Sequence, residues 1–367
     1  MTFTTRFIAA AGAAALLAAC GSGESKGTVG ATSGTAAATS SSGVDLTGAG
    51  ATFPQPIYSK WISDYAAKTG VKINYQSIGS GGGIRQLSEQ TVDFGASDSP
   101  MRDDEMTKAK GGPVMHIPTV LGAVVMTYNV AGLTRPLRLS GPVIADIYLG
   151  KITKWNDTRI SSLNPGVTLP ANDILVVHRS DGSGTTFIFS EYLAAVSPQW
   201  KTAPGVGKEL QWPAGIGAKG NEGVAGQVKQ TPNSIGYVEL AYAKQNRLAY
   251  ASVRNAAGQF VEPSVQSVTA AAEGAVSKLP ANTDYRVSIV NAAGAQAYPI
   301  SSFTWILAYR NQSDSVKARK LKDFLRWALT EGEQSAAGLD YAPLPASLAQ
   351  KLTARLDSIQ TGAGAGR

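Results

Sequence analysis

Four residues between positions 179 and 185 offer the donors that an oxyanion site needs. Arg179 carries a fixed fork of N–H donors, Ser183 and Thr185 carry hydroxyls, and Gly184 lets the backbone approach a ligand closely. A strand-to-helix turn in which Asp181 or Ser183 only caps the helix explains these residues equally well. Taken alone, the segment is equally consistent with an anion site and with a capped turn.

The elements expected on either side of these residues favour an anion site. Residues 174–177 form a short apolar run typical of a buried parallel strand, and the spacing of Ile188, Tyr192 and Val196 predicts a helix face. The first turn of a helix has N–H groups without internal partners and carries the positive end of the helix dipole. A strand, a glycine loop and a helix in this order would direct those groups at an anion.

An earlier stretch repeats this order. Residues 45–54 read as a short strand and a glycine turn, and a helix is predicted after them that ends at Gly70. Thr52 and Phe53 are therefore expected at a second helix N-terminus.

A third copy lies a little further along the chain. Residues 71–75 alternate as a strand, a glycine-rich loop at 78–83 contains Ser80, and a helix is predicted over 84–90. The alternative is a flexible linker, but linkers seldom lie between a strand and a helix inside a domain.

Asp98 adds a carboxylate after a further short strand within residues 92–100. The side chain could simply cap the helix predicted near residues 103–105, or hold the turn at Pro100. Because three other segments favour an anion, Asp98 could instead face the same anion as they do.

The first 44 residues predict export and a membrane anchor. Residues 1–19 contain Arg6 and then an apolar stretch that is too short to span a bilayer, as in export signals. Leu-Ala-Ala-Cys, ending at Cys20, resembles the lipobox of bacterial lipoproteins, which implies a lipid on the Cys20 thiol. An ordinary signal peptide with an unrelated cysteine is the alternative. Residues 20–44 are almost wholly small and polar, so we expect a flexible tether and a location in the periplasm or at the cell surface.

Composition argues against several other functions. The net charge of +7 fits an anionic ligand, but no consecutive Lys or Arg run occurs, so no nucleic-acid partner is expected. Cys20, His116 and His178 are the chain's cysteine and histidines and cannot form a zinc cluster; we expect His116 to be structural and His178 to have no binding role. Residues 215–220 match GxGxxG but follow no buried strand. We interpret them as a loop before a helix over 224–230 and expect no nucleotide, cofactor or metal.

Two long apolar segments are expected to connect two domains. Residues 115–128 would leave the first domain, and a buried strand within residues 298–309 would return to it. The resulting prediction is a discontinuous domain I of residues 45–118 plus 299–367, and a domain II of residues 119–298.

Six motifs taken together resemble one known family. Residues 48–54, 78–82, 93–98, 148–152, 179–185 and 234–239 are similar, in this order, to those of the PstS family of phosphate-binding proteins. These are the extracytoplasmic substrate-binding components of bacterial phosphate ATP-binding cassette (ABC) importers. The resemblance covers Leu46 to the C-terminus. It implies an α/β, two-domain fold of the periplasmic binding protein type (type II), with a cleft for inorganic phosphate between the domains.

The resemblance also implies residue roles and partners. Asp181 would hold Arg179 in place, and Gly81 stands where many relatives have serine, so no side-chain contact is expected there. The partners would be inorganic phosphate and the inner-membrane permease of an importer with its ATPase. The implied phosphate contacts are Thr52, Phe53 (backbone N–H), Ser80, Asp98, Arg179, Ser183, Gly184 (backbone N–H) and Thr185.

Asp98 gives a physical reason for choosing phosphate. A carboxylate accepts hydrogen bonds, so it suits an anion only if that anion carries a proton. Hydrogen phosphate has such a proton, whereas sulfate at neutral pH has none. Sulfate would leave Asp98 as a desolvated charge that faces lone pairs, which lowers affinity by orders of magnitude.

Two other functions remain to be weighed against phosphate capture. The protein could be a receptor for another oxyanion or for a phosphate ester. It could also be a secreted phosphatase or serine hydrolase that uses Ser183. The segment around Ser183 lacks the GxSxG elbow, and only His116 and His178 could serve as an imidazole base, so we expect no catalytic residue.

Overall fold

The computed structural model describes residues 43, 45–133, 135–276, 279 and 283–361. The described residues from Gly43 onward form one compact unit. The predicted export signal, Cys20, nearly all of the predicted tether and the tail at 362–367 lie outside the described residues. No helix within the described ranges is both long and apolar enough to cross a bilayer.

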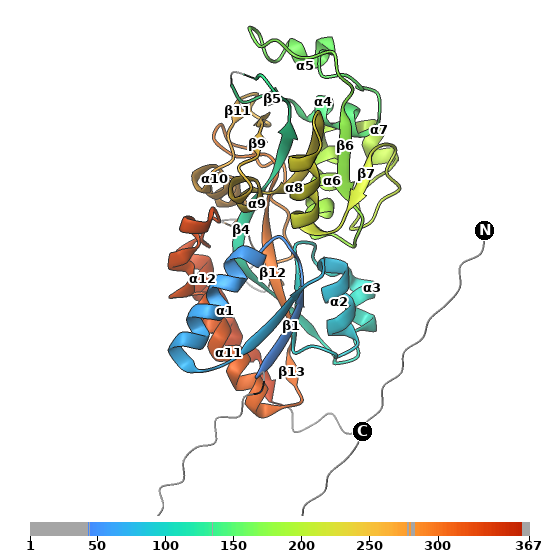
Figure 1. The fold of residues 1–367 in the computed structure, drawn as a ribbon. Helices are drawn as coiled ribbons and strands as arrows, with labels where there is room; N and C mark the ends of the chain where they lie inside the picture. The colour runs from blue at the N-terminus through green and yellow to red at the C-terminus, as the bar shows by residue number, and fades with distance from the viewer. Residues whose placement is uncertain (1–42, 44, 134, 277–278, 280–282, 362–367) are drawn as a thin grey trace, which may run out of the picture. The chain divides into compact units, whose positions relative to one another are not determined.

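The compact unit has two lobes (Figure 1). Lobe I contains β1 (Leu46–Gly50), α1 (Gln55–Thr69), β2 (Ile73–Ser77), α2 (Ser80–Ser88), β3 (Phe94–Ser97), α3 (Asp103–Lys108), the first part of β4 (Val114–Asn129), β12 (Ser301–Tyr309), β13 (Asn311–Gln312), α11 (Ser315–Ala328), α12 (Ala346–Arg355), β14 (Gln360–Thr361) and three short 3-10 turns. Lobe II contains the rest of β4, β5 (Arg138–Leu139), α4 (Gly141–Tyr148), α5 (Thr158–Ser161), β6 (Leu175–Arg179), α6 (Gly184–Val196), α7 (Pro198–Thr202), β7 (Ile216–Ala218), α8 (Gly220–Gln230), β8 (Ser234–Glu239), α9 (Leu240–Gln245), β9 (Ala249–Tyr250), β10 (Ser252–Arg254), β11 (Phe260–Val261) and α10 (Val265–Val276).

One sheet path runs through both lobes, in the order β2-β1-β3-β12-β4-β8-β6-β7 among the described strands. Strand β1 pairs in parallel with β2 and β3, and β6 pairs in parallel with β7 and β8. Strand β12 lies between β3 and β4 and is antiparallel to both. Alternating strands and helices with parallel pairing make this an α/β fold, as the sequence predicts.

Strand β4 belongs to both lobes. From Val114 to Ala123 it pairs with β12, and from Val124 it pairs with β8. Figure 1 shows β4 and β12 running from one lobe toward the other. Residues of β4 are buried up to Tyr128, which fits an apolar run with elements on both faces. The lobes thus join at paired strands, and the domain limits at 118/119 and 298/299 stay a prediction.

Helix α1 shows how the sequence sets an element near the site. Its buried face contains Ile57, Trp61 and Tyr65, which repeat at helical spacing. The helix ends at Gly70, whose φ of 76° is the left-handed conformation that glycine adopts without strain. The predicted stop at Gly70 is therefore confirmed.

Helix α2 begins four residues earlier than predicted, at Ser80 rather than at residue 84. The three glycines after Ser80 were expected in a loop, and glycine has a low helix propensity. In the structure, a Cβ on Gly83 would lie 2.5 Å from Gly50 Cα and 2.8 Å from the Ala96 carbonyl oxygen. Gly83 is therefore needed for helix α2 to pack directly on strands β1 and β3, and this contact outweighs the low helix propensity of glycine.

The interpretation of residues 215–221 as a loop is wrong. Residues Ile216–Ala218 form β7, which pairs in parallel with β6, and α8 begins at Gly220 rather than at residue 224. The three residues of β7 are not fully buried, so they lack the apolar run that marks an interior strand. The N-terminus of α8 is thereby placed beside the other predicted anion-binding segments.

His116 is a buried structural residue, as expected. Its Nε2 accepts a hydrogen bond from the Met101 N–H at 3.0 Å, and its Nδ1 lies 2.8 Å from Asp284 Oδ2. Both ring nitrogens therefore have hydrogen-bond partners.

Candidate functional site

Parallel strands bring the predicted residues to one edge of the sheet. Thr52 follows β1, Asp98 follows β3, and Arg179 is the last residue of β6. Ser80 is the first residue of α2, and Ser183 is the N-cap of α6. In open α/β sheets, ligands bind in the crevice outside the carboxyl ends of the strands. Because these residues follow or end parallel strands, or start the helices after them, they are expected to lie in one crevice.

Asp98 is buried among groups that donate hydrogen bonds. Only 1% of the residue is exposed, and Thr304 Oγ1 donates to Asp98 Oδ1 at 2.7 Å. Ser80 Oγ lies 3.4 Å from Asp98 Oδ2 and accepts the Asp98 N–H at 3.1 Å. Burial raises the pKa of Asp98 to about 7, although the hydrogen bond from Thr304, the positive charge of Arg179 and Ser80 act in the opposite direction. Asp98 can therefore change its charge near neutral pH.

Asp181 holds Arg179 in place, the role that the resemblance implies for it. The Arg179 Nε donates to Asp181 Oδ1 at 2.7 Å and its Nη2 donates to Asp181 Oδ2 at 2.5 Å, a bidentate pair. Burial alone would raise the pKa of Asp181, but the Arg179 guanidinium and the Gly220 N–H bring that pKa below its usual value. The remaining guanidinium nitrogen, Nη1, lies 3.4 Å from Thr185 Oγ1 and can face a ligand.

The first turn of α6 supplies further donors. Ser183 Oγ accepts the Thr186 N–H at 3.0 Å, and the intrahelical bonds start with the Phe187 N–H donating to the Ser183 carbonyl at 3.1 Å. The N–H groups of Gly184 and Thr185 precede that first bond, at the positive end of the helix. The capping role of Ser183 and the anion-site interpretation therefore apply together.

Gly184 brings this turn directly against lobe I. A Cβ added to Gly184 would lie 2.5 Å from Asp98 Oδ2 and 2.7 Å from Asp98 Cβ, and it would also overlap Ser80 Oγ. Real Cβ atoms do not approach other atoms so closely, so glycine is required at this position. Residues from the two lobes thus converge on one small region.

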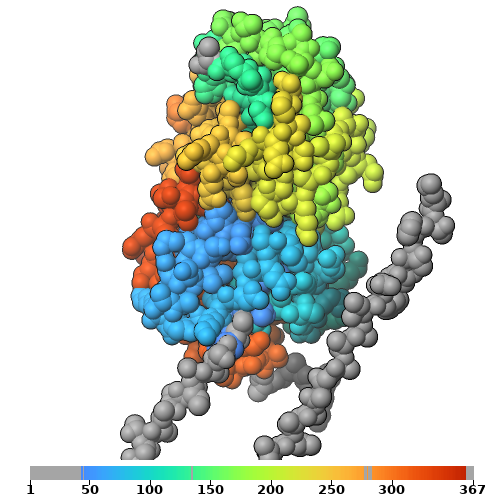
Figure 2. Space-filling model, viewed as in Figure 1, coloured from blue at the N-terminus to red at the C-terminus, as the bar shows by residue number. Residues whose placement is uncertain are grey.

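Other contacts join the lobes around this region. The Gly81 N–H donates to the Gly182 carbonyl at 2.8 Å, and Lys208 Nζ lies 2.6 Å from Glu105 Oε1. Figure 2 shows the yellow surface of lobe II resting on the blue surface of lobe I. The predicted ligand residues with side-chain donors or acceptors are buried in this closed arrangement: Thr52, Ser80, Asp98, Arg179, Ser183 and Thr185.

Hydrogen bonds from two tyrosines hold the backbone at Thr52 and Phe53. The Phe53 ring is fully buried, and its carbonyl accepts a hydrogen bond from the Tyr341 hydroxyl at 2.6 Å. The Thr52 carbonyl accepts from the Tyr242 hydroxyl at 2.6 Å. Two tyrosines therefore fix the turn that carries Thr52 and the Phe53 N–H.

Asn221 lies at the centre of the site and was missed by the sequence analysis. It is fully buried, and its side-chain nitrogen lies 2.7 Å from Thr52 Oγ1 and 3.0 Å from Thr185 Oγ1. The signal available was the glycine pattern ending at Gly220, which in this chain marks the start of α8. The helix was expected to start at residue 224, which left Asn221 in the preceding loop.

The geometry suits binding of an oxyanion and does not form a catalytic triad. The His178 ring stacks on Trp212 at 4.7 Å between centroids, and the His116 nitrogens are bonded to Met101 and Asp284. Neither described histidine is hydrogen-bonded to Ser183. No cluster of three or more potential metal ligands occurs within the described ranges.

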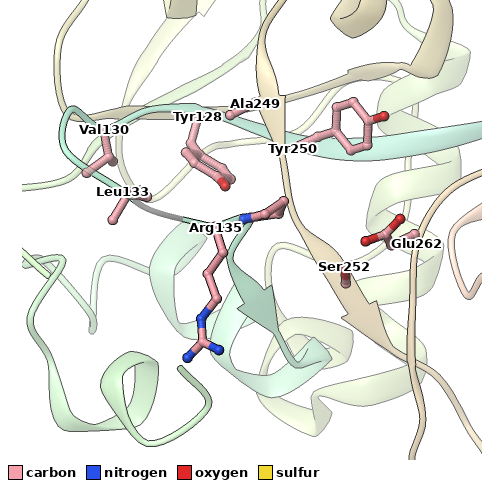
Figure 3. Close-up of a pocket in the computed structure, with 9 residues that line it drawn as sticks. Tyr128, Val130, Leu133, Arg135, Ala249, Tyr250, Ser252 and Glu262 are labelled. Atoms are coloured by element: carbon pink, nitrogen blue, oxygen red, sulfur yellow. The ribbon is translucent and has the colours of Figure 1, made fainter. Parts of the chain in front are cut away.

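A separate cavity of about 370 Å³ lies in lobe II (Figure 3). Tyr128, Arg135, Tyr250, Ser252 and Glu262 are among its lining residues, and none of the predicted ligand residues lines it. The candidate anion site is therefore distinct from this cavity.

Comparisons with known proteins agree with this fold. The PBP superfamily domain matches residues 30–331. The "Phosphate-binding protein PstS" of Xylella fastidiosa is 49% identical over 312 residues, covering 85% of this chain and 84% of that protein. The protein of the same name from Pasteurella multocida is 48% identical over 311 residues, covering 84% and 89%.

A solved phosphate binding protein from Stenotrophomonas maltophilia has the same fold, with a TM-score of 0.65 and 21% identity, covering 84% of this chain and 93% of that one. This structural likeness supports the two-lobed architecture, and the sequence identity to the curated relatives extends over most of both chains. The chain therefore has the two-domain periplasmic binding fold and belongs to the PBP superfamily and, within it, to the PstS family.

Proposed function

We propose that this protein captures inorganic phosphate between its lobes and delivers it to the permease of a phosphate ABC importer. The names of the relatives at 47–49% identity support the ligand and the transport role. The protein is accordingly a binding component and not an enzyme. The contacts around Ser183 give no support to the hydrolase alternative.

The observation that carries the proposal is the buried carboxyl of Asp98, which lies among hydroxyl donors of lobe I and against the first turn of α6 from lobe II. Ser80 and Thr304 approach it from lobe I, and Gly184 in the first turn of α6 approaches it from lobe II. Donors suit the oxygens of any tetrahedral oxyanion, whereas the carboxylate suits an oxyanion that brings a proton. Protonated phosphate meets both requirements.

Each ligand contact in this proposal has a specific source. Thr52, Ser80, Ser183 and Thr185 would donate their hydroxyl hydrogens, and Arg179 would donate from Nη1. The Phe53 and Gly184 N–H groups would donate from the backbone, and Asp98 would accept the proton of phosphate. Ser183 Oγ still accepts the Thr186 N–H while its hydrogen points elsewhere, so the cap does not compete with the ligand.

Binding would require the lobes to open and close. The site residues are buried in the arrangement described, so phosphate can enter only after the lobes separate. Strands β4 and β12 connect the lobes and are the segments about which such a hinge motion would occur. Closure would then present a defined surface to the permease. The domain limits proposed for this motion are those expected from the sequence, near residues 118 and 299.

Export and anchoring complete the proposal. Periplasmic export is in keeping with the PstS relatives, and a lipid on Cys20 would hold the protein at a membrane through the tether of residues 20–44. Intact-mass measurement of protein purified from a bacterial host tests the anchor. A mass that includes the lipid and lacks residues 1–19 is expected; Cys20→Ser should then release the protein in soluble form, and an unmodified thiol in the mature protein would reject the anchor.

Calorimetric titration of the ligand-stripped protein tests the proposed ligand. Phosphate should bind with a 1:1 stoichiometry, and arsenate, which is also protonated, should compete. Sulfate and glycerol phosphate should bind far more weakly. Absence of heat and of a thermal shift with phosphate would reject the proposal, and tighter binding of glycerol phosphate than of phosphate would redirect it to phosphate esters.

A further inference from the structure

The two threonines of the site share one hydrogen-bond partner, Asn221, the second residue of α8. The Asn221 side-chain nitrogen lies 2.7 Å from Thr52 Oγ1, which belongs to lobe I, and 3.0 Å from Thr185 Oγ1, which belongs to lobe II. An amide nitrogen has two hydrogens, so it can donate one to each hydroxyl oxygen.

The orientation of this amide is fixed from behind. The backbone N–H of Glu239 donates to Asn221 Oδ1 at 2.9 Å. A reversed amide would place its own N–H groups against that N–H and leave buried donors without acceptors, which costs about 1–3 kcal/mol for each buried group. The Glu239 N–H can only donate, so Asn221 must present its nitrogen to the threonines.

Each threonine oxygen has a second donor. The Asn221 backbone N–H donates to Thr52 Oγ1 at 3.1 Å, and Arg179 Nη1 donates to Thr185 Oγ1 at 3.4 Å. A hydroxyl oxygen has two lone pairs and one hydrogen. With both lone pairs engaged, the interaction left to Thr52 and to Thr185 is donation of the O–H hydrogen.

We infer that Asn221 is a positioning residue that fixes the Thr52 and Thr185 hydroxyls as hydrogen-bond donors. This inference rests on the proposed function and extends it. Two hydroxyls that could otherwise turn either way are held as donors, so the ligand must present unprotonated oxygens to both. The proton of the ligand is then directed to Asp98, and Asn221 contributes to selectivity without touching the ligand.

A double-mutant cycle tests the inference, with phosphate affinity measured by titration calorimetry on the intact soluble chain. Asn221→Ala should lower the affinity about 10- to 30-fold, the size of one or two hydrogen bonds that lose their orientation. In a Thr52→Val background, the same change should cost at most about a third of that factor, since one of the two hydroxyls that Asn221 orients is gone. Equal losses in both backgrounds, or no loss in the wild type, would overturn the inference.

A matched control uses Asn129, which binds the other end of the same helix. Its side-chain nitrogen donates to the Val228 and Lys229 carbonyls at 3.0 Å. Asn129→Ala should lower the melting temperature but leave phosphate affinity within about twofold. A comparable loss of affinity in this variant would mean that any disturbance of α8 weakens binding, and would reject a specific role for Asn221.

Asn221→Asp is a second test variant, and it preserves the volume of the side chain. Its carboxylate would accept the hydroxyl hydrogens of Thr52 and Thr185, which reverses their polarity, and the Asp variant should therefore bind more weakly than Asn221→Ala. Binding equal to or stronger than that of the Ala variant would contradict the inference. If the wild-type protein fails to bind phosphate at all, the proposed function fails; if it binds but the cycle is additive, only the inference fails.

Discussion

Raising the pH from 6 to 8.5 should remove most of the sulfate affinity of this protein while phosphate affinity changes much less. Asp98 has a pKa of about 7 because it is buried, so its carboxyl is mainly neutral at pH 6 and mainly charged at pH 8.5. Neutral Asp98 can donate a hydrogen bond to a sulfate oxygen, whereas charged Asp98 repels it. Phosphate carries its own proton across this range and can donate it to charged Asp98.

The size of the effect follows from the pKa. Each pH unit above the pKa makes protonation of Asp98 harder by about 1.36 kcal/mol, a factor of ten. At pH 8.5, which is 1.5 units above a pKa of about 7, sulfate binding should therefore be weaker by about 2 kcal/mol, or roughly 30-fold, than its limit at low pH. The sign is that of a group with a raised pKa: the neutral form that sulfate needs is present below about pH 7 and is lost as the pH rises.

Titration calorimetry with sulfate at half-unit pH steps measures this dependence directly. The logarithm of the sulfate dissociation constant should be flat below about pH 6.5 and should rise by about one per pH unit above pH 7.5. Asp98→Asn removes the titrating group and should abolish the slope while bringing sulfate and phosphate affinities closer together. A pH-independent sulfate affinity in the wild type, or an unchanged slope in Asp98→Asn, would refute the acceptor argument.

Three further changes test the closed site. Gly184→Ala should lower phosphate affinity at least 100-fold, because the added Cβ would be forced against Asp98. The control is Gly226→Ala, a position in α8 where the added Cβ has no non-local neighbour within 4 Å; it should leave affinity unchanged and stabilise the protein by about 0.5–1 kcal/mol in chemical denaturation. Equal phosphate affinities in the two variants would contradict the close approach of Gly184 to Asp98. Arg179→Lys should weaken phosphate binding by at least about tenfold, because lysine cannot keep the bidentate bond to Asp181 while facing the ligand, and affinity within twofold of wild type would exclude that role. A double-mutant cycle of Lys208→Gln and Glu105→Gln should give a coupling energy of about 0.5–1 kcal/mol in phosphate binding, since these side chains are only 13% and 17% exposed. The exposed Lys60–Asp64 pair, measured by its coupling energy in protein stability, is the reference. A Lys208–Glu105 coupling as small as that of the reference pair would mean that this contact has no part in closure.

Most of the site could be predicted because its residues are tied to local sequence signals. A glycine turn, a hydroxyl residue and a following helix indicate a helix N-terminus, and such signals correctly located Ser183 before α6 and Thr52 before α1. The parallel arrangement of the strands then brings these ends together, as the placement of Asp98 beside Ser80 confirms. Local pattern and topology together were sufficient to place these residues near one another, whereas their roles as phosphate contacts came from the resemblance and stay a prediction.

The features that were not predicted, the early start of α2 and the place of Asn221 in the site, depend on contacts between segments far apart in the sequence. The start of α2 includes Gly83 because this residue packs on Gly50 and Ala96, and local helix propensity does not reveal that contact. Asn221 matters because it reaches Thr52, which lies 169 positions away in the sequence. An asparagine in a helix start has no distinctive pattern of its own, so its role becomes visible only when both threonines are in place.

The insertion of β12 between β3 and β4 sets a limit on when lobe I can assemble during synthesis. β12 spans Ser301–Tyr309, so the chain must emerge from the ribosome almost to its end before this strand can fill its place. The paired segments of lobe II lie between residues 124 and 261 and are complete much earlier. We expect nascent chains that stop before residue 300 to be cleaved readily by protease throughout residues 45–123, a state that also suits passage across a membrane.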